Sequence, residues 1–379
     1  MKIGIDCRTI LNPERDIKGG IGHYTYQLVR HLLKIDKENQ YVLFFDRALK
    51  KQKMVKFLQP NSRVKFFPFK QYAKFLPSIY SNYLISAALE EEKLDIFHSP
   101  TLSLPHSYKG KGIVTAHGLA RYRGLKWFPK DELSKAKKIR PSAINQASEV
   151  IAPSNFVKNE LKELFDLDNS KINVVYHGLD SRFFLKSSKA ERKKILKKYK
   201  IKKNYIFFLG TLEARKNIVA LIDTFEYVRK KLKLNWQLVL GGNPGFNYKE
   251  ITKKIKKSKF KKDIILTGYV SPDDLDSLFG EARVYIFPSF YEGFCLSVIE
   301  AMAKGVPVIT SNNTALPEIT KGAALLVDPA KKEEIIKALE KVLFDKNLRK
   351  DLVQNGLKRA KEFSWDKCAK ETLEVYKKS

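Results

Sequence analysis

The first half of the chain alternates short apolar runs with segments in which apolar residues recur every three or four positions. Short apolar runs predict buried strands, and the wider spacing is typical of helices that bury one face. The predicted strands are residues 2–6, 41–46, 64–69, 95–98, 112–116, 149–152 and 172–176, and the predicted helices are residues 22–35, 78–92, 131–147 and 155–165. Such alternation indicates an α/β unit with a doubly wound parallel sheet.

The same alternation starts again in the second half. Strands are predicted at residues 205–209, 236–240, 263–267, 284–287, 307–311 and 323–327. A chain of 379 residues exceeds one ordinary core, so two domains are expected. We predict a first domain at residues 1–183, a second at residues 184–362 that opens on a basic linker and helix, and a final helix at residues 363–379.

Composition supports a folded protein that works in a reducing compartment. Hydrophobic residues make up 44% of the chain and aromatic residues 12%, which is enough to fill two cores. No apolar run is long enough to predict a transmembrane helix, and residues 1–6 already have the pattern of a strand. Cys7, Cys295 and Cys368 lie too far apart in sequence to suggest a metal or disulfide framework. We therefore expect a cytoplasmic protein, either dissolved or peripheral on the inner face of the membrane.

The net charge of +31 indicates an anionic partner without naming it, because lipid headgroups, nucleic acid and phosphorylated substrates all fit. Residues 47–80 and 121–140 mix Lys and Arg with aromatic residues, as membrane-binding surfaces do. Solvated lysines above ordinary core aromatics explain the same pattern. Both interpretations stay open.

The most informative stretch is residues 283–318. An apolar strand ends at Pro288, a loop carries Glu292 and Gly293, and a buried helix follows before the next strand. Ligands of such βαβ units sit at the carboxyl ends of the strands, which here is the loop with Glu292.

Glu292 and Glu300 stand at the two ends of this predicted helix. From Phe294 to Glu300 it would rise about 9 Å, and the first-turn amides of Phe294, Cys295 and Leu296 would carry the positive end of its dipole. Two carboxylates beside an anion-binding helix terminus suit a nucleoside diphosphate sugar. By spacing alone, a solvated Glu292 and a salt-bridged Glu300 are the commoner explanation of such a pair.

The sequence of this stretch resembles the signature of the family 4 retaining glycosyltransferases. The matching segments are Glu292–Phe294, Glu300–Met302, Gly305–Ile309 and Leu316–Glu318, with Cys295 where Gly is usual and Ser297 where Pro is usual. The resemblance implies the GT-B fold, in which two Rossmann-like domains face each other across a cleft. It also implies that Glu300 holds the nucleotide ribose and Glu292 the hydroxyls of the donor sugar. Gly293, Phe294, Cys295 and Leu296 would line the donor site.

Two features of the first half gain meaning from the resemblance. A glycine turn, with Gly20 and Gly22, opens a helix after the first strand, where backbone amides can cradle phosphate. It resembles the family's loop that faces the donor phosphates and the acceptor. His117 follows the strand at 112–116, and the resemblance implies that it lines the cleft beside the transferred sugar. Gly118 stands where Asp is usual.

Arg215 and Lys216 follow the first strand of the second half. A guanidinium can bridge two phosphate oxygens and an ammonium adds a compact charge. The segment Gly210–Asn217 resembles the family's pyrophosphate-binding segment. The predicted catalytic residues are therefore Glu292, His117, Arg215 and Lys216. The Asp-x-Asp runs at 166–168 and 274–276 have the spacing of a magnesium site, but we expect them to cap helices or face solvent, and we expect neither a metal nor another cofactor.

The predicted reaction transfers a hexose from a nucleoside diphosphate sugar to a glycan or a polyprenyl-diphosphate-linked acceptor, with retention of configuration. The segments 210–217 and 292–300 look most like those of bacterial mannosyltransferases of surface-polysaccharide synthesis that use GDP-mannose. A UDP-sugar donor and a nucleotide-sugar epimerase on the same fold are the alternatives. A non-enzymatic basic protein that binds membrane or nucleic acid is the third class, and it gives Arg215, Lys216, Glu292 and Glu300 no role. We expect no nucleic-acid partner.

Overall fold

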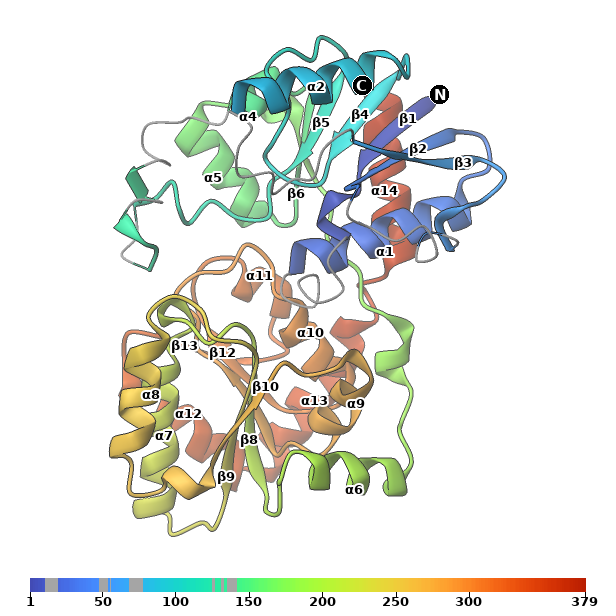
Figure 1. Ribbon diagram of the computed structural model, residues 1–379. Helices are drawn as coiled ribbons and strands as arrows, with labels where there is room; N and C mark the ends of the chain where they lie inside the picture. Colours follow the sequence, from blue (N-terminus) through green and yellow to red (C-terminus); the bar gives the residue numbers. More distant parts are fainter. Residues whose placement is uncertain are drawn as a thin grey trace. The chain divides into compact units, whose positions relative to one another are not determined.

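The computed structural model describes residues 1–10, 20–47, 54, 56–67, 78–124, 127–130, 133–134 and 142–379. The chain divides into two units (Figure 1). The N-terminal unit comprises Met1–Gly124, Leu133–Gly178 and Trp365–Ser379, and the C-terminal unit comprises Leu125–Glu132 and Leu179–Ser364.

The described part of the N-terminal unit contains a parallel sheet in the order β3-β2-β1-β4-β5-β6-β7. The strands are β1 Lys2–Asp6, β2 Gln40–Phe45, β3 Ser62–Phe66, β4 Ile96–Ser99, β5 Gly112–Thr115, β6 Glu149–Ala152 and β7 Ile172–Val174. The helices are α1 Gly20–Ile35, α2 Ser78–Glu90, α4 Ser142–Gln146, α5 Asn155–Phe165 and α14 Trp365–Lys378. The order reverses between β1 and β4, where a doubly wound sheet opens a crevice at its carboxyl edge.

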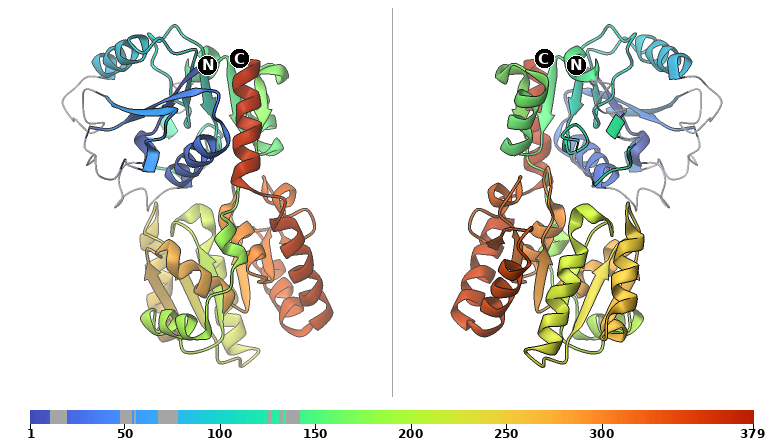
Figure 2. Two further views of the ribbon diagram at one scale, coloured as in Figure 1. Left: turned by 90° about the vertical axis from the view of Figure 1, so that its right-hand side faces the viewer. Right: turned by 90° about the vertical axis from the view of Figure 1, so that its left-hand side faces the viewer.

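The last helix of the chain, α14, packs along α1, the first helix of the N-terminal unit (Figure 2). Its apolar face is buried through Trp365, Ala369 and Tyr376. The Tyr376 hydroxyl lies 2.7 Å from Nδ1 of His98 on β4, a histidine that is completely buried. This helix is therefore held by a specific polar contact as well as by apolar burial.

The C-terminal unit is built on a second parallel sheet, with the order β10-β9-β8-β11-β12-β13 in the described chain. The strands are β8 Tyr205–Leu209, β9 Gln237–Gly241, β10 Ile264–Gly268, β11 Val284–Phe287, β12 Val308–Ser311 and β13 Leu325–Val327. The helices are α6 Lys189–Lys198, α7 Ile218–Lys230, α8 Tyr248–Lys257, α9 Pro272–Gly280, α10 Leu296–Ala303, α11 Leu316–Thr320, α12 Lys332–Phe344 and α13 Lys346–Ala360. Since β8 and β11 are neighbours, the loops that follow them meet at one edge of the sheet.

The apolar pattern explains both cores. Strands of a parallel sheet are covered on both faces, and β8 and β11 accordingly expose almost none of their Ile, Phe, Tyr and Val side chains. Phe208 and Phe287 stack across these two strands with ring centroids 5.4 Å apart. In the N-terminal unit, Phe44 and Phe67 stack in the same way at 5.2 Å.

The predicted α/β class with two parallel, doubly wound sheets is confirmed. All predicted strands are present, with ends that differ by a few residues. The predicted helix at 131–147 is described in full only over α4, because residues 135–141 lie outside the described residues, as do parts of the basic aromatic segments at 47–80 and 121–140. None of the helices that the structure describes has the length and apolar character needed to cross a membrane.

Candidate functional site

Arg215 and Lys216 lie on a short 3-10 turn, Ala214–Lys216, at the carboxyl end of β8. Asn217 ends the turn in the left-handed conformation (φ 55°) and starts α7, and its side-chain amide donates to the carbonyl of Pro329 at 2.6 Å. The turn follows Gly210, against which the loop after β9 packs closely. A Cβ at Gly242, where φ is +133°, would lie 1.9 Å from the Gly210 oxygen, so only glycine fits there. This close packing fixes the start of the loop that carries Arg215 and Lys216.

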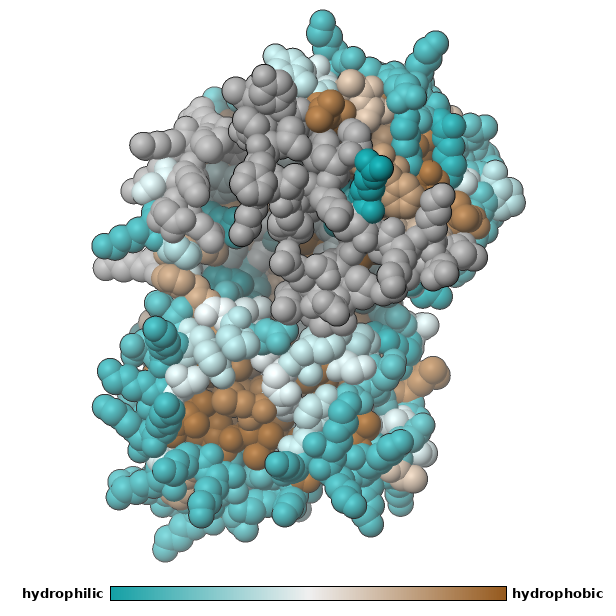
Figure 3. Space-filling model, viewed as in Figure 1, coloured by the Kyte–Doolittle hydropathy of each residue, from teal (hydrophilic) through white to brown (hydrophobic). Residues whose placement is uncertain are grey.

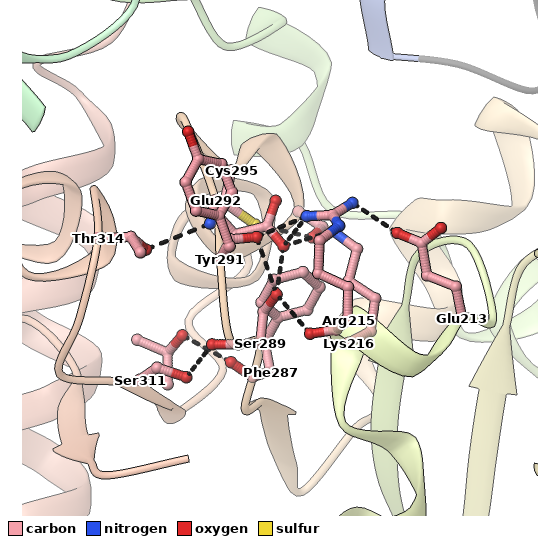
Figure 4. A network of polar contacts seen from close by, with 12 residues as sticks. Glu213, Arg215, Lys216, Phe287, Ser289, Tyr291, Glu292, Cys295, Ser311 and Thr314 are labelled. Carbon is pink, nitrogen blue, oxygen red and sulfur yellow. Dashed lines mark hydrogen bonds and ion pairs between the residues drawn. The ribbon is translucent and has the colours of Figure 1, made fainter. Parts of the chain in front are cut away.

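Glu292 comes from the loop after β11 and meets both cations (Figure 4). Its Oε1 accepts from Lys216 Nζ at 2.5 Å and from Arg215 Nη1 at 3.1 Å. The Ser289 hydroxyl donates to the same oxygen at 2.6 Å. The backbone joins the two loops as well, because the Phe290 amide donates to the Arg215 carbonyl at 2.9 Å.

Other groups fix the two cations in place. The Arg215 guanidinium also donates to the carbonyl of Tyr291 and, at 2.6 Å, to Glu213. The Lys216 ammonium lies 4.8 Å from the centre of the Phe287 ring, within reach of a cation–π attraction. Lys216 and Glu292 are only 8% and 9% exposed. The arrangement is therefore rigid and nearly dry, which strengthens its electrostatic interactions.

Burial alone would raise the pKa of Glu292, but Lys216 and Arg215 hold the pKa of this carboxyl below its ordinary value. Glu292 is thus ionised at neutral pH. Burial by itself would lower the pKa of Arg215, but the carboxylates of Glu292 and Glu213 raise it. Two cations and two carboxylates balance each other here, so an entering anion must compete with Glu292 and Glu213 for Arg215 and Lys216.

Glu300 lies inside α10 and differs from Glu292 in its surroundings. It is 9% exposed, and its carboxylate makes no hydrogen bond or ion pair with the residues that the structure describes. Burial raises the pKa of Glu300 to about 7, opposed by the charge of Arg182 and supported by that of Asp180. A buried acceptor that lacks a protein partner is costly unless a ligand supplies one. Glu300 is therefore suited to accept hydrogen bonds from hydroxyl groups.

The structure corrects the predicted start of this helix. α10 begins at Leu296, so its first-turn amides belong to Leu296, Ser297 and Val298 and not to Phe294. Phe294 instead packs its ring edge-on against Phe363, with centroids 5.8 Å apart. Cys295 is the buried residue before the first turn, and Gly293 precedes it in the loop. The helix still begins only a few residues after Glu292, at Leu296.

The glycines and His117 belong to the N-terminal unit. Helix α1 begins at Gly20, two residues earlier than predicted, so Gly22 is a buried helical residue and not part of the turn. His117 follows β5, and its Nε2 lies 3.0 Å from the carbonyl of Pro100. A carbonyl only accepts, so Nε2 carries the proton and Nδ1 is left as an acceptor. Burial lowers the pKa of His117 to about 4, which keeps the ring neutral.

The Asp-x-Asp runs have structural partners. Asp166 ends α5 in the left-handed conformation and Asp168 caps the turn that follows, as predicted. Asp274 and Asp276 were expected to cap a helix or face solvent, but both have charged partners in the protein. Asp274 contacts Lys198 and Tyr199, and Asp276 pairs with Lys304. Among the described residues, no three His, Cys, Asp or Glu side chains form a group that could hold a metal ion.

Sequence reasoning missed four residues that shape the site. Ser289 and Thr314 hold Glu292 through its side chain and its backbone amide, at 2.6 and 3.2 Å. Glu213 anchors Arg215, and the sequence indicated it only as a member of the segment Gly210–Asn217. Arg182 precedes α10 by more than one hundred residues, and no spacing in the sequence connects it with Glu300.

Comparison with known proteins identifies related sequences over most of the chain. Residues 18–183 match the family described as "Glycosyltransferase Family 4", and residues 189–359 match "Glycosyl transferases group 1". The O-antigen chain mannosyltransferase B of Escherichia coli is 29% identical over 368 residues, which covers 94% of this chain and 96% of that protein. A mannosyltransferase of Mycolicibacterium hassiacum, named MMP alpha-(1->4)-mannosyltransferase, is 28% identical over 62% of this chain and 55% of its own length.

Solved structures show the same fold at low identity. HepE of Anabaena in complex with UDP-glucose superposes with a TM-score of 0.77 at 15% identity, with 100% of both chains covered. The sucrose-phosphate synthase of Thermosynechococcus elongatus gives 0.76 at 17% identity, covering 100% of this chain and 98% of the other. WaaG, described as a glycosyltransferase involved in lipopolysaccharide biosynthesis, gives 0.74 at 12% identity over 99% of both chains.

Proposed function

Because this chain belongs to the glycosyltransferases with a family 4 N-terminal domain and a group 1 C-terminal domain, we propose that it transfers mannose from GDP-mannose with retention of configuration. The acceptor is a glycan or a polyprenyl-diphosphate-linked saccharide of surface-polysaccharide synthesis. The similarity to the O-antigen chain mannosyltransferase over almost the whole length of both chains supports the sugar and the acceptor class.

The contact of Arg215 and Lys216 with Glu292 carries the proposal. Breaking the bond between a sugar and a diphosphate leaves negative charge on the terminal phosphate. A diphosphate between the two loops draws Arg215 and Lys216 away from Glu292, since they lie within a few ångströms of it. Prepositioned cations in a water-poor site stabilise developing charge without reorganisation, which is the largest contribution in many enzymes.

The carboxylate of Glu292, once released from the two cations, can bind the sugar of the donor. Glu292 remains ionised, and an oxygen freed from Lys216 can accept a hydrogen bond from a sugar hydroxyl. Glu300 accepts from the ribose hydroxyls, which supply the partners that its carboxylate lacks in the protein. His117 offers the unprotonated Nδ1 of a neutral ring as an acceptor for a further sugar hydroxyl.

Donor identity is tested by thermal shift with GDP, UDP and ADP, followed by assay of the matching nucleotide sugars. We expect GDP to raise the melting temperature most, and GDP-mannose with a saccharide acceptor to yield GDP and an α-linked mannoside. NMR of the anomeric proton reports retention. Preference for UDP would establish the UDP-sugar alternative, and conversion of the donor without acceptor would establish an epimerase.

Metal removal is expected to leave turnover unchanged, because Arg215 and Lys216 supply the positive charge that Mg²⁺ provides at other diphosphate sites. Initial rates are compared before and after dialysis against EDTA, with and without added Mg²⁺ or Mn²⁺. A rate that falls to background in EDTA and returns with either ion would refute this expectation.

A further inference from the structure

Three basic loops lie at the amino edge of the C-terminal sheet. They are residues 197–204 before β8, residues 229–236 before β9 and residues 256–263 before β10, and each includes the last two residues of the preceding helix. Together they contain fourteen Lys and Arg residues and one acidic residue, Asp263, whereas the whole chain has 72 basic and 41 acidic residues. This imbalance far exceeds the general lysine excess of the chain. We call the three loops the basic edge.

The strand order brings the three loops together. β8, β9 and β10 are parallel neighbours, with Tyr205 beside Gln237 and Leu238 beside Ile264 near their first residues. Neighbouring strands lie about 4.8 Å apart, so their entry loops form one continuous surface. The one acidic residue is neutralised by two of the cations, because Asp263 pairs with Lys203 at 2.7 Å and with Arg229 at 3.1 Å.

Several lysines of the basic edge have no protein partner. Lys231, Lys256, Lys261 and Lys262 are exposed and form no ion pair within the described part of the chain. The half-buried rings of Trp236 and Phe260 lie in the same loops. The lower part of the C-terminal unit in Figure 3 is covered by hydrophilic residues. Unpaired like charges on one surface repel each other, which an anionic partner would relieve.

The basic edge is separate from the donor loops. Arg215 and Glu292 follow the carboxyl ends of β8 and β11, while the basic edge precedes the amino ends of β8, β9 and β10. Five residues of β8 span about 17 Å between the two edges. The cations of the basic edge are therefore not part of the diphosphate site.

We propose that the basic edge docks the protein electrostatically on an anionic lipid bilayer. Thirteen of its fourteen cations are lysines, whose flexible stems and strongly hydrated charges suit mobile headgroups. Arginine forks, which nucleic acids and fixed phosphates favour, are almost absent from it. Trp236 and Phe260 add rings of the kind that settle at a membrane interface. In this orientation the donor loops face the water in which a nucleotide sugar is dissolved.

The test compares two variants with the same change in charge. In the edge variant Lys231, Lys256, Lys261 and Lys262 become Gln. In the control variant Lys337, Lys341, Lys346 and Lys350 become Gln, which are exposed residues of α12 and α13. Binding is measured by co-sedimentation with vesicles of equimolar phosphatidylglycerol and phosphatidylcholine, and with vesicles of pure phosphatidylcholine.

We expect the wild type to bind the anionic vesicles and not the neutral ones, with an affinity that falls as salt rises. The edge variant should lose about 100-fold in partitioning, and the control variant less than about threefold. Both should keep the wild-type circular dichroism spectrum and the wild-type turnover of a water-soluble acceptor. Absence of wild-type binding, or equal losses in the two variants, would overturn the proposal. So would an edge variant that loses single-stranded RNA binding while its vesicle binding is unchanged.

Discussion

Replacing Lys216 by alanine is expected to lower kcat by about 10²–10³-fold while the fold is kept. Lys216 is 8% exposed, and its ammonium is held between the Glu292 carboxylate and the Phe287 ring, so it is already close to the diphosphate site before a ligand binds. A cation fixed in this way stabilises the leaving diphosphate without moving far. Steady-state kinetics with a saturating donor measure the effect, and a variant with near-normal kcat would contradict the proposed role.

The same substitution removes one of the three side-chain partners of the buried Glu292 carboxylate, so a matched double variant is needed. In Lys216→Ala, Glu292 keeps Arg215 and Ser289, and we expect a loss of about 1–3 kcal/mol in the free energy of unfolding. Combining it with Glu292→Gln removes the unbalanced charge and should recover part of this stability without recovering kcat. Denaturant unfolding and kinetics on both variants separate catalysis from folding.

Replacing Glu300 by glutamine is expected to weaken nucleotide binding by about ten- to a hundredfold at a pH where Glu300 is ionised. A carboxylate accepts stronger hydrogen bonds from ribose hydroxyls than a neutral amide, and the volume of the side chain is preserved. Isothermal titration with GDP measures the change. A dissociation constant equal to that of the wild type would rule out the ribose contact, whatever happens to turnover.

The raised pKa of Glu300, about 7, adds a pH dependence of known sign. In the folded protein this group holds its proton above its ordinary value of 4.5, so it favours folding at low pH, and that contribution is lost as pH rises through 7. Hydroxyl donors favour the ionised form, so nucleotide binding should be about tenfold weaker near pH 6 than near pH 8. The Glu300→Gln variant should keep only the pH dependence of the nucleotide itself.

Arg182 offers an independent check on the same group. Its charge opposes the effect of burial on Glu300, while Asp180 acts in the other direction and the buried Tyr285 on β11 faces the same carboxylate. In Arg182→Gln the midpoint of the pH dependence should move upward, because the carboxylate loses a positive charge that lowers its pKa. A change in affinity with an unmoved midpoint would mean that Arg182 affects nucleotide binding without acting through the protonation of Glu300.

The sequence was sufficient for the architecture because burial in a parallel sheet leaves a local trace. Strands covered on both faces read as short apolar runs, and every such run proved to be a strand. The start of α9 also has a local basis, because the Ser271 side chain caps the helix and Pro272 is its first residue. Boundaries were less accurate at α1, whose first residue is Gly20, and at α10, where Cys295 precedes the helix without a capping hydrogen bond from its side chain.

The site was only partly readable. Arg215, Lys216, Glu292 and Glu300 stood out by residue type and by resemblance, but their protonation and pairing did not. The sequence predicted a contact of Glu292 with sugar hydroxyls, but it did not predict that Glu292 also pairs with both cations. That pairing depends on two loops that are more than seventy residues apart and meet only because β8 and β11 are neighbours.

By itself, then, the sequence determined the fold class, the succession of strands and helices along the chain, and the residues that carry chemistry. Each of these leaves a signal within a few neighbouring positions. The tertiary structure alone decided which charges meet, which carboxylate is paired and which is left open, and where the excess of lysine collects. Charge interactions depend on distance and burial in space, and parallel strands place their ends together irrespective of how far apart they lie in the chain.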